Sequence, residues 1–317
     1  MNAECIARIF DSGRRAAIVF TGGGSGAIHA LLSTPGASRF VRDAHIPYSP
    51  EALERFLGKP AGHSVSPDTA LRMARAAFFQ TLEKPDEKVP GIGISCTAAL
   101  QTDRERRGDD RAFIAIKTAE TEKLFALYLS KSSRAEQEAL LSDRLLELIA
   151  QAVGAERSLI FPGSFNPVHH GHLKLLKAVE EMTGLHGVFE LSCTNVDKPE
   201  TPEDECLRRV AAIRDIPVAL TQTPRFTQKA KLFPKTTFVL GHDTAVRLID
   251  YAQPGEWELF QTLETKLLVA GRLHHSVFQC LEDLKLPPGF ESLFEAVPEE
   301  KFREDVSSTE LRGRANV

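Results

Sequence analysis

Short apolar runs alternate with amphipathic stretches along this chain, and the two patterns predict strands and helices in turn. In the first half, strands are expected at 15–20, 89–96 and 112–117, and helices at 3–12, 27–32 and 119–152. In the second half, strands are expected at 158–161, 237–240 and 266–270, and helices at 172–182, 203–214 and 243–250. Such alternation is typical of α/β folds, in which helices cover both faces of a parallel sheet and ligands bind at the carboxyl ends of the strands.

The alternation of strands and helices starts afresh near the middle of the chain. A length of 317 residues exceeds what one hydrophobic core usually supports. The segment Gly154–Arg157 separates a long helical stretch from the next strand, and it is the expected boundary. We therefore predict two α/β domains, residues 1–153 and residues 154–317.

Composition and charge narrow the range of functions. The net charge of −4 provides no general attraction to nucleic acid or anionic lipid. No apolar run is long enough to span a membrane, and the first residues, MNAECIARIFDSGRR, lack the apolar core of a signal peptide. Five scattered cysteines without a CxxC pair indicate reduced thiols rather than a zinc site or a disulfide framework. We therefore expect a cytoplasmic protein that binds neither nucleic acid nor a membrane.

The segment LIFPGSFNPVHHGHLKLL (159–176) carries the strongest chemical signal. It predicts a buried strand, a glycine-containing turn, and then His169-x-Gly171-His172 at the start of a helix. Gly163 and Ser164 would let the backbone approach a ligand and offer N–H donors, and a helix start favours phosphate. Two imidazoles there could donate to phosphoryl oxygens, with Gly171 keeping the space between them clear of a side chain.

Two further segments add groups suited to a nucleotide. In VSSTELRGR (306–314), hydroxyls precede a predicted helix start and an arginine follows one turn later, a combination that binds anions. In VLGHD (239–243), an acidic residue stands at the carboxyl end of a buried strand, where it suits ribose hydroxyls and would repel phosphate.

Together, GSFNPVHHGH and SSTELR resemble the HxGH and SSTxxR signatures of the nucleotidyltransferase superfamily. Gly241-x-Asp243 and the single tryptophan, Trp257, make residues 157–317 most similar to nicotinamide or nicotinate mononucleotide adenylyltransferases. The resemblance implies a Rossmann-like fold with a parallel sheet. It also implies transfer of AMP from ATP to a small phosphorylated acceptor, nicotinamide or nicotinate mononucleotide, with release of pyrophosphate.

The same resemblance assigns roles to individual residues. His169, His172 and Arg312 are implied to be catalytic, because in this family they hold the triphosphate and its leaving pyrophosphate end. Trp257 is implied to lie against the acceptor's pyridine ring, and Lys198 is a candidate contact for its phosphate. The implied nucleotide-binding residues are Gly163, Ser164, Phe165, Asn166, Gly241, Asp243, Ser307, Ser308 and Thr309. Mg²⁺ is expected to arrive with ATP and to keep mostly water ligands, so no residue is assigned as a metal ligand.

Other interpretations remain open for the second half. A cytidylyltransferase, a pantetheine-phosphate adenylyltransferase or a nucleotide-binding regulator without turnover would carry similar signatures. Asp243 could cap the following helix, Trp257 could belong to the core, and Lys198 could be a solvated lysine. Three other histidines, His242, His274 and His275, are expected at the surface or behind the ligands.

In the first half, IVFTGGGSGAIHALLSTPGASRF and IPYSPEALERFLG resemble the CinA C-terminal domain family, the nicotinamide-mononucleotide deamidases. The resemblance covers residues 1–118 and a following helix. The family's serine nucleophile falls on Val19, its neighbouring glutamate on Ile18, and its lysine on Leu53, while Tyr48 matches. A valine cannot attack a carbonyl carbon, so we expect the amidase activity to be lost.

A degenerate deamidase domain could still have a role. Its Thr21–Gly26 loop stands at a predicted helix start and could hold a phosphate, although it lacks the Gly-Lys-Ser/Thr of a P-loop. A purely structural domain, or one through which the chain forms a homo-oligomer, is an equally good interpretation.

Overall fold

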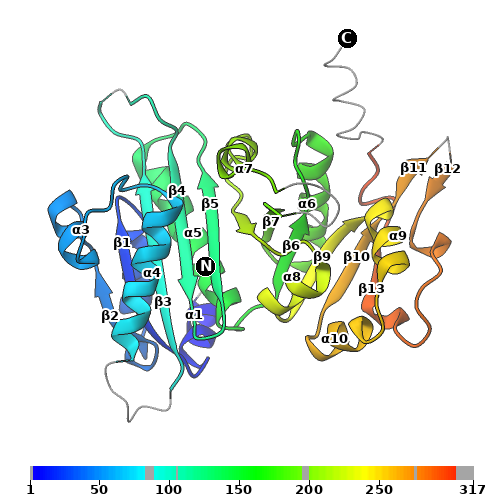
Figure 1. The fold of residues 1–317 in the computed structure, drawn as a ribbon, viewed down its shortest axis with the longest axis horizontal. Coiled ribbons are helices and arrows are strands. Elements are labelled where there is room, and N and C mark those ends of the chain that lie inside the picture. The colour runs from blue at the N-terminus through cyan, green and yellow to red at the C-terminus, as the bar shows by residue number, and fades with distance from the viewer. Residues whose placement is uncertain (1–2, 83–88, 105, 195–199, 275–276, 305–317) are drawn as a thin grey trace. The chain divides into compact units, whose positions relative to one another are not determined.

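The computed structural model describes residues 3–82, 89–104, 106–194, 200–274 and 277–304. The chain forms two compact units, which are described separately (Figure 1). The first contains residues 1–156 together with 214–220, and the second contains residues 157–213 together with 221–317.

The first unit is built on a mixed sheet. Its strands follow the order β2-β1-β3-β4-β5-β8. Strand β1 pairs in parallel with β2 and β3, whereas β4 pairs with β3 and β5 in antiparallel fashion. The sheet of the first unit is therefore mixed rather than wholly parallel, because β4 and β5 run antiparallel to their neighbours. The strands are β1 (Arg15–Thr21), β2 (Val41–His45), β3 (Gly91–Ala99), β4 (Arg111–Lys117), β5 (Glu122–Tyr128) and β8 (Val218–Thr221).

Helices cover the sheet of the first unit. Helix α4 packs along β1, β3 and β4, as Figure 1 shows, while α1 and α2 pack on α5. The stretch 119–152, predicted as one helical segment, contains β5 and then α5, because Ser133 caps a new helix in a capping box with Glu136. The helices are α1 (Ala3–Phe10), α2 (Ser25–Ser33), α3 (Pro50–Leu57), α4 (Pro67–Thr81) and α5 (Arg134–Ala152), with a 3₁₀ turn at Ala37–Arg39.

A short segment from the second half of the sequence completes the first unit. Residues 214–220 lie along β5, and β8 pairs with it in antiparallel fashion, with Ala219 opposite Phe125. The Asp215 N–H donates to the Tyr128 carbonyl over 2.8 Å, and the Asp215 carboxylate accepts from the Ser130 N–H over 2.9 Å. Local sequence patterns place this segment in a helix and a loop, and they do not indicate its partner strand.

The second unit has a parallel sheet, as predicted. Strand β6 pairs in parallel with β7 and β9, and β10 pairs in parallel with β9 and β13. All these strands therefore end at one edge of the sheet, where the candidate site is expected. The strands are β6 (Ser158–Pro162), β7 (Gly187–Ser192), β9 (Thr236–Gly241), β10 (Lys266–Ala270) and β13 (Phe294–Val297).

The helices of the second unit connect these strands. They are α6 (His170–Thr183), α7 (Glu203–Val210), α8 (Phe226–Leu232), α9 (His242–Tyr251) and α10 (Glu256–Thr262). A small hairpin, β11 (Arg272–His274) and β12 (Val277–Gln279), and two 3₁₀ turns (Leu281–Asp283 and Glu291–Leu293) precede β13. None of the helices in the described part of the chain has the length and apolarity that a membrane span needs.

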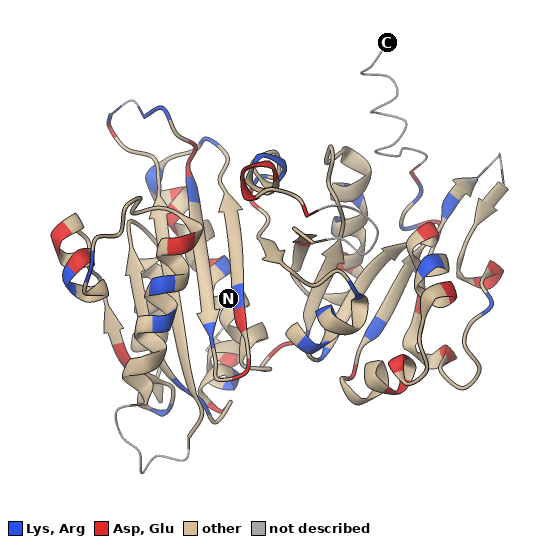
Figure 2. Cartoon of the chain, in the orientation of Figure 1, with Lys and Arg blue, Asp and Glu red and all other residues tan. Residues whose placement is uncertain are grey.

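Charge and burial follow the layers of both units. Figure 2 shows charged residues of both signs spread over helices and loops, while most strands are free of charged residues along much of their length. Strands β1 and β4 are buried through their centres, as the apolar runs predict. All five cysteines are free thiols, in line with their scattered positions.

Candidate functional site

The turn after β6 is folded tightly over an aromatic ring. The Gly163 N–H donates to the Glu190 carbonyl of β7 over 2.9 Å, so this N–H group is not available to a ligand, contrary to the expectation. A Cβ atom on Gly163 would lie 2.7 Å from the Phe165 ring, which explains the glycine. Phe165 has a positive φ of 42° and is 2% exposed, so its ring is not available to a nucleotide. Arg209 donates to the Ser164 carbonyl over 3.4 Å, and Ser164 itself is exposed.

An aromatic cluster supports the second histidine of the HxGH motif. The ring of Phe165 lies 4.6 Å from that of Phe189 and 5.2 Å from that of His172, measured between centroids. Phe161 contacts the same three rings at 5.4–6.0 Å. The position of His172 therefore depends on the packing at the carboxyl ends of β6 and β7.

The two histidines lie against each other at the mouth of α6. Their ring centroids are 3.8 Å apart, with an angle of 33° between the planes. The His169 N–H donates to Nδ1 of His172 over 3.2 Å. Because Nδ1 accepts this bond, neutral His172 carries its proton on Nε2. The Nδ1 atom of His169 is buried and has no hydrogen-bond partner among the described residues.

Both rings are held in the neutral form at pH 7. Burial lowers the pKa of His172 to about 4, and the neighbouring His169 lowers it further. Burial also lowers the pKa of His169, an effect that His170 reinforces and Glu304 opposes. The site thus presents neutral N–H donors next to the positive end of a helix, an arrangement suited to phosphoryl oxygens.

Glu304, which sequence reasoning did not single out, is held beside the same helix start. Its carboxylate accepts from Nε2 of His170 at 3.1 Å and makes a short ion pair with Lys174. A Cβ atom on Gly171 would lie 3.7 Å from the Glu304 Cβ. The signal for Glu304 was its place three residues before the SSTELR motif. Lys198, Ser307, Ser308, Thr309 and Arg312 lie outside the described residues.

The Gly241-x-Asp243 segment lies at the same edge of the sheet as the turn after β6. Gly241 ends β9, the strand beside β6, and a Cβ atom there would meet open space. The Asp243 carboxylate makes a short ion pair with Arg272, so its charge is already partly neutralised. His242 is buried rather than at the surface, and its Nε2 has no hydrogen-bond partner among the described residues.

Trp257 lies away from the histidines. It belongs to α10, and its ring packs on Phe260 and Phe294, each at 5.6 Å. Phe294 begins β13, and α10 leads directly into the start of β10, so both lie at the amino-terminal edge of the parallel sheet. Figure 1 shows α10 at the lower end of this unit. The HxGH turn follows the carboxyl end of β6, so the structure does not bring Trp257 beside the histidines, and its acceptor role remains a prediction.

In the first unit, buried apolar side chains occupy the two positions where the deamidase family has its nucleophile and its lysine. Val19 and Leu53 are 0% and 2% exposed and belong to one cluster with Ala17, Met73 and Ala77. The resemblance placed a nucleophile and a lysine at Val19 and Leu53. The structure thus leaves neither a nucleophile nor a base at these two positions.

Tyr48, the one matching residue, lines a pocket of about 360 Å³. The side chain is 68% exposed, and its hydroxyl accepts a long hydrogen bond, 3.5 Å, from Arg134. The pocket is lined by Phe20, Gly22, Gly23, Ser25, Ile46, Tyr48, Arg134 and Glu138.

The glycine-rich loop 21–26 is explained by close packing. A Cβ atom on Gly22 would lie 1.9 Å from the Ala98 carbonyl oxygen, and one on Gly24 would lie 2.5 Å from Leu145. Both glycines also have positive φ angles, 79° and 89°. The loop therefore needs glycine to fit between β3 and α5, whether or not a ligand binds.

A carboxylate of the chain itself occupies the donors of this loop. Glu138 of α5 accepts from the Gly24 N–H at 2.8 Å, the Gly26 N–H at 3.1 Å and the Ser25 hydroxyl at 3.0 Å. The sequence suggested that this helix start could hold a phosphate. In the structure Glu138 fills that place, so a phosphate would have to displace it.

Comparison with known proteins agrees with the geometry of the second unit. Residues 160–314 match the family model described as cytidylyltransferase-like. This part of the chain is therefore similar to cytidylyltransferase-like domains. The matched range contains the HxGH turn, the Gly241-x-Asp243 segment and the SSTELR motif, which lie far apart in the sequence. The comparison with curated proteins finds no match.

The N-terminal half is similar to solved CinA superfamily structures. A competence-damaged protein (CinA) superfamily protein from Enterobacter cloacae is 18% identical, with 47% of this chain and 88% of that chain covered and a TM-score of 0.39. The competence/damage-inducible protein CihA from Agrobacterium tumefaciens is 19% identical, covers 48% and 94%, and has a TM-score of 0.40. A CinA superfamily protein from Klebsiella pneumoniae is 12% identical, covers 49% and 100%, and has a TM-score of 0.40.

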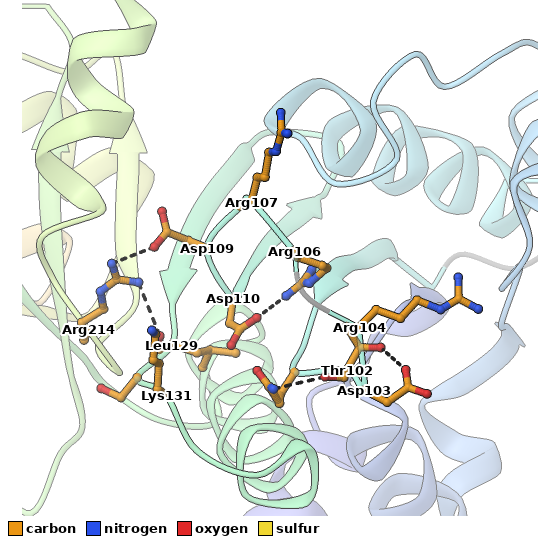
Figure 3. Close-up of a pocket in the computed structure, with 13 residues that line it drawn as sticks. Thr102, Asp103, Arg104, Arg106, Arg107, Asp109, Asp110, Leu129, Lys131 and Arg214 are labelled. Atoms are coloured by element: carbon orange, nitrogen blue, oxygen red, sulfur yellow. Dashed lines mark hydrogen bonds and ion pairs between the residues drawn. The ribbon is translucent and has the colours of Figure 1, made fainter.

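A larger cavity, of about 820 Å³, lies at the β3–β4 loop of the first unit (Figure 3). The four arginines that line it are already paired with carboxylates or point in different directions. Arg214 bonds the Asp109 carboxylate at 2.9 Å, and Arg106 forms a short ion pair with Asp110. Figure 3 shows Arg104 and Arg107 pointing in different directions, so they do not converge on one anion.

Arg272 and Glu138 are further functional candidates that sequence reasoning missed. Arg272 comes directly after the carboxyl end of β10, which was the available signal for a site residue. Glu138 lies within a helix among several other charged residues, and nothing in the sequence distinguishes it from them. No group of three or more His, Cys, Asp or Glu side chains in the described ranges could hold a metal ion.

Proposed function

We propose that the cytidylyltransferase-like domain transfers AMP from ATP to nicotinamide or nicotinate mononucleotide and releases pyrophosphate. One observation carries this proposal, namely the stacked pair His169 and His172 at the start of α6. Both rings are neutral at pH 7, and His172 presents Nε2–H because its Nδ1 accepts a backbone N–H. Fixed donors of this kind are suited to stabilising charge that develops on a phosphoryl group.

The reaction needs no protein nucleophile. A phosphate oxygen of the acceptor attacks the α-phosphorus of ATP, the bond from that phosphorus to the bridging oxygen breaks, and pyrophosphate leaves with the electron pair. The domain contributes positioning and donors for the transferring phosphoryl group, which supply most of the catalysis in such transfers. Mg²⁺ would arrive with the triphosphate and neutralise part of its charge.

Glu304 supports the expected convergence of the two signature motifs. It is bonded to His170 and Lys174 of α6, and it precedes the SSTELR motif by only a few residues. Three residues of extended chain span at most about 11 Å. Because Glu304 is held at the start of α6, the described chain ends beside the HxGH turn, only three residues before the SSTELR motif begins.

Fewer observations support the proposed identity of the nucleoside and of the acceptor than support the transfer reaction itself. Asp243 lies at the carboxyl end of β9, beside β6, where its carboxylate could accept from ribose hydroxyls. Arg272 holds this carboxylate and would fix its orientation. The pyridine acceptor rests on the sequence resemblance alone, because Trp257 packs at the other edge of the sheet.

A matrix of donors and acceptors tests the proposal. Purified full-length protein is incubated with Mg²⁺ and either ATP or CTP, each with nicotinamide mononucleotide, nicotinate mononucleotide or phosphopantetheine, and pyrophosphate release is measured. We expect turnover with ATP and a pyridine mononucleotide. Turnover only with CTP or with phosphopantetheine would replace the substrate assignment. ATP binding by calorimetry without pyrophosphate release from any pair would indicate a nucleotide-binding regulator instead.

A further inference from the structure

A buried ion pair lies beneath the turn after β6. Lys229 of α8 donates to both carboxylate oxygens of Glu190 on β7, at 2.6 and 2.7 Å. The two side chains are 5% and 1% exposed. The Thr221 hydroxyl adds a short hydrogen bond to the same carboxylate, and it accepts from Thr223 at 2.9 Å. The carboxylate is thus held from two sides.

Stability alone does not account for this pair. Burial lowers the pKa of Lys229, because removing the ammonium from water disfavours its charged form, and the Glu190 carboxylate opposes that shift. The desolvation of two buried charges often cancels their attraction, so apolar residues of similar size are commonly as stable. A pair of charges at this position suggests a requirement for defined geometry.

The pair is directly coupled to the HxGH turn. The Glu190 carbonyl accepts from the Gly163 N–H over 2.9 Å, so the main chain of Glu190 holds the start of the turn. Neighbouring residues of a strand face opposite sides of the sheet. On the side opposite Glu190, Phe189 therefore packs on Phe165, which in turn contacts His172. A shift at the end of β7 would move both the turn and the ring of His172.

We propose that Glu190 and Lys229 are positioning residues for the HxGH site: their ion pair fixes the carboxyl end of β7, and through it the Gly163 turn and the orientation of His172. The kinetic part of this inference rests on the proposed function. The structural part concerns the His172 ring itself and can be measured without any substrate.

The test compares a broken pair with a replaced pair in the full-length chain. Lys229→Met leaves a buried carboxylate without its cation, and we expect it to lower the midpoint of thermal unfolding by about 10 °C. The double variant Glu190→Leu with Lys229→Met should recover to within about 3 °C of the wild type, because both charges are gone. The matched control is Lys177→Met, which removes an exposed lysine of α6 that pairs with Glu181 at 4.0 Å.

The decisive readouts are turnover and the tautomer of His172. We expect the kcat of the double variant to fall about tenfold and its KM for ATP to change less than about twofold. Misplaced hydrogen-bond donors slow the chemical step more than they weaken ATP binding. By nitrogen NMR at pH 7, wild-type His172 should show Nε2–H alone and the double variant a mixture of tautomers. Lys177→Met should match the wild type in both.

Several outcomes separate the inference from the proposed function. A double variant with wild-type kcat and a single Nε2–H tautomer would show that the pair only fills space, and it would overturn the inference. If the wild type transfers no nucleotide, the proposed function fails, and the tautomer comparison still decides the inference. If the double variant does not fold, Glu190→Gln, which keeps the size of the side chain, is measured in the same way, and an unchanged tautomer there counts against positioning.

Discussion

The backbone N–H of His169 donates to Nδ1 of His172 over 3.2 Å, so the main chain of the first histidine sets the tautomer of the second. The proton of His172 is thereby directed to Nε2, the ring atom away from the turn. In the proposed nucleotidyl transfer, this atom donates to the triphosphate. The relationship depends on the local path of the chain, since His169 is the cap residue of α6 and His172 lies in its first turn.

Removing the His172 ring should impair turnover and leave the fold intact. We expect His172→Ala to lower kcat by about a hundredfold or more, because loss of one preorganised donor costs roughly 3 kcal/mol. Pyrophosphate release measures the effect, and circular dichroism checks the fold. Tyr48→Phe in the first unit is the control and should transfer nucleotide at the wild-type rate. Wild-type turnover by His172→Ala would exclude a catalytic role for this residue.

The free energy of unfolding should decrease as the pH is lowered from about 6.5 to 4, because His172 has a lowered pKa in the folded chain. Its folded-state pKa is about 4, below the usual 6.5, so in this range the unfolded chain binds a proton that the folded chain does not. Protonation then favours unfolding as pH falls, and the effect is absent above 6.5 and complete below 4. Burial lowers the pKa of His169 too, so it acts in the same direction. Urea unfolding at pH 7 and pH 5 measures the loss of stability.

The matched variant for the pH experiment is His172→Phe, which keeps a ring against Phe161 and Phe165. We expect this variant to lose less stability than the wild type between pH 7 and pH 5, since one titrating group has been removed. The difference between the two proteins isolates His172 from the carboxylates, which titrate in both. An equal loss in both proteins would contradict the lowered pKa of His172.

Glu138 should stabilise the first unit by filling the donors of the glycine-rich loop. We expect Glu138→Ala to lower the free energy of unfolding by about 2 kcal/mol, because two N–H groups and a hydroxyl lose a charged acceptor. Acetate or formate in the buffer should restore part of this loss in the variant. The control Glu54→Ala changes an exposed carboxylate of the same unit and should show neither effect. If neither anion helps Glu138→Ala, the donors of the loop do not form an anion site.

Restoring the deamidase residues should not restore the chemistry. Val19→Ser combined with Leu53→Lys places a hydroxyl and an ammonium in the cluster of Ala17, Met73 and Ala77. A buried ammonium without a partner is costly, and we expect a loss of about 4 kcal/mol in the free energy of unfolding. Urea unfolding measures this loss, and release of ammonia from nicotinamide mononucleotide measures the amidase. A stable variant with amidase activity would show that the pocket is otherwise preserved.

Sequence reasoning was accurate where the signal is local. The apolar runs located β1, β4, β6 and β10, since a buried strand needs consecutive apolar residues wherever it is placed. It was less accurate where two local patterns adjoin. Residues 119–152 contain apolar residues at helical spacing only from α5 onward, and the preceding β5 owes its place in the sheet to β4 and β8.

Contacts between segments that are distant in the sequence decided the rest of the candidate site. An aromatic residue after a Gly-x-Asp segment suits a stacking role, yet the direction of α9 carries Trp257 to the amino-terminal edge of the sheet. Arg272 begins β11 and Glu304 lies in the segment after β13, so both reach the site from positions distant in the sequence, and each is one of many charged residues. Their contacts depend on how the strands are ordered, which no short motif encodes.

By itself, the sequence determined many of the strands and helices and the HxGH turn, because strand burial, helix capping and a glycine turn act over a few neighbouring residues. Tertiary structure alone decided that residues 214–220 complete the first unit, that Glu138 fills the glycine-rich loop and that Trp257 lies far from the histidines. Each of these follows from contacts between segments distant in the sequence, whose energies depend on the whole packed arrangement rather than on local pattern.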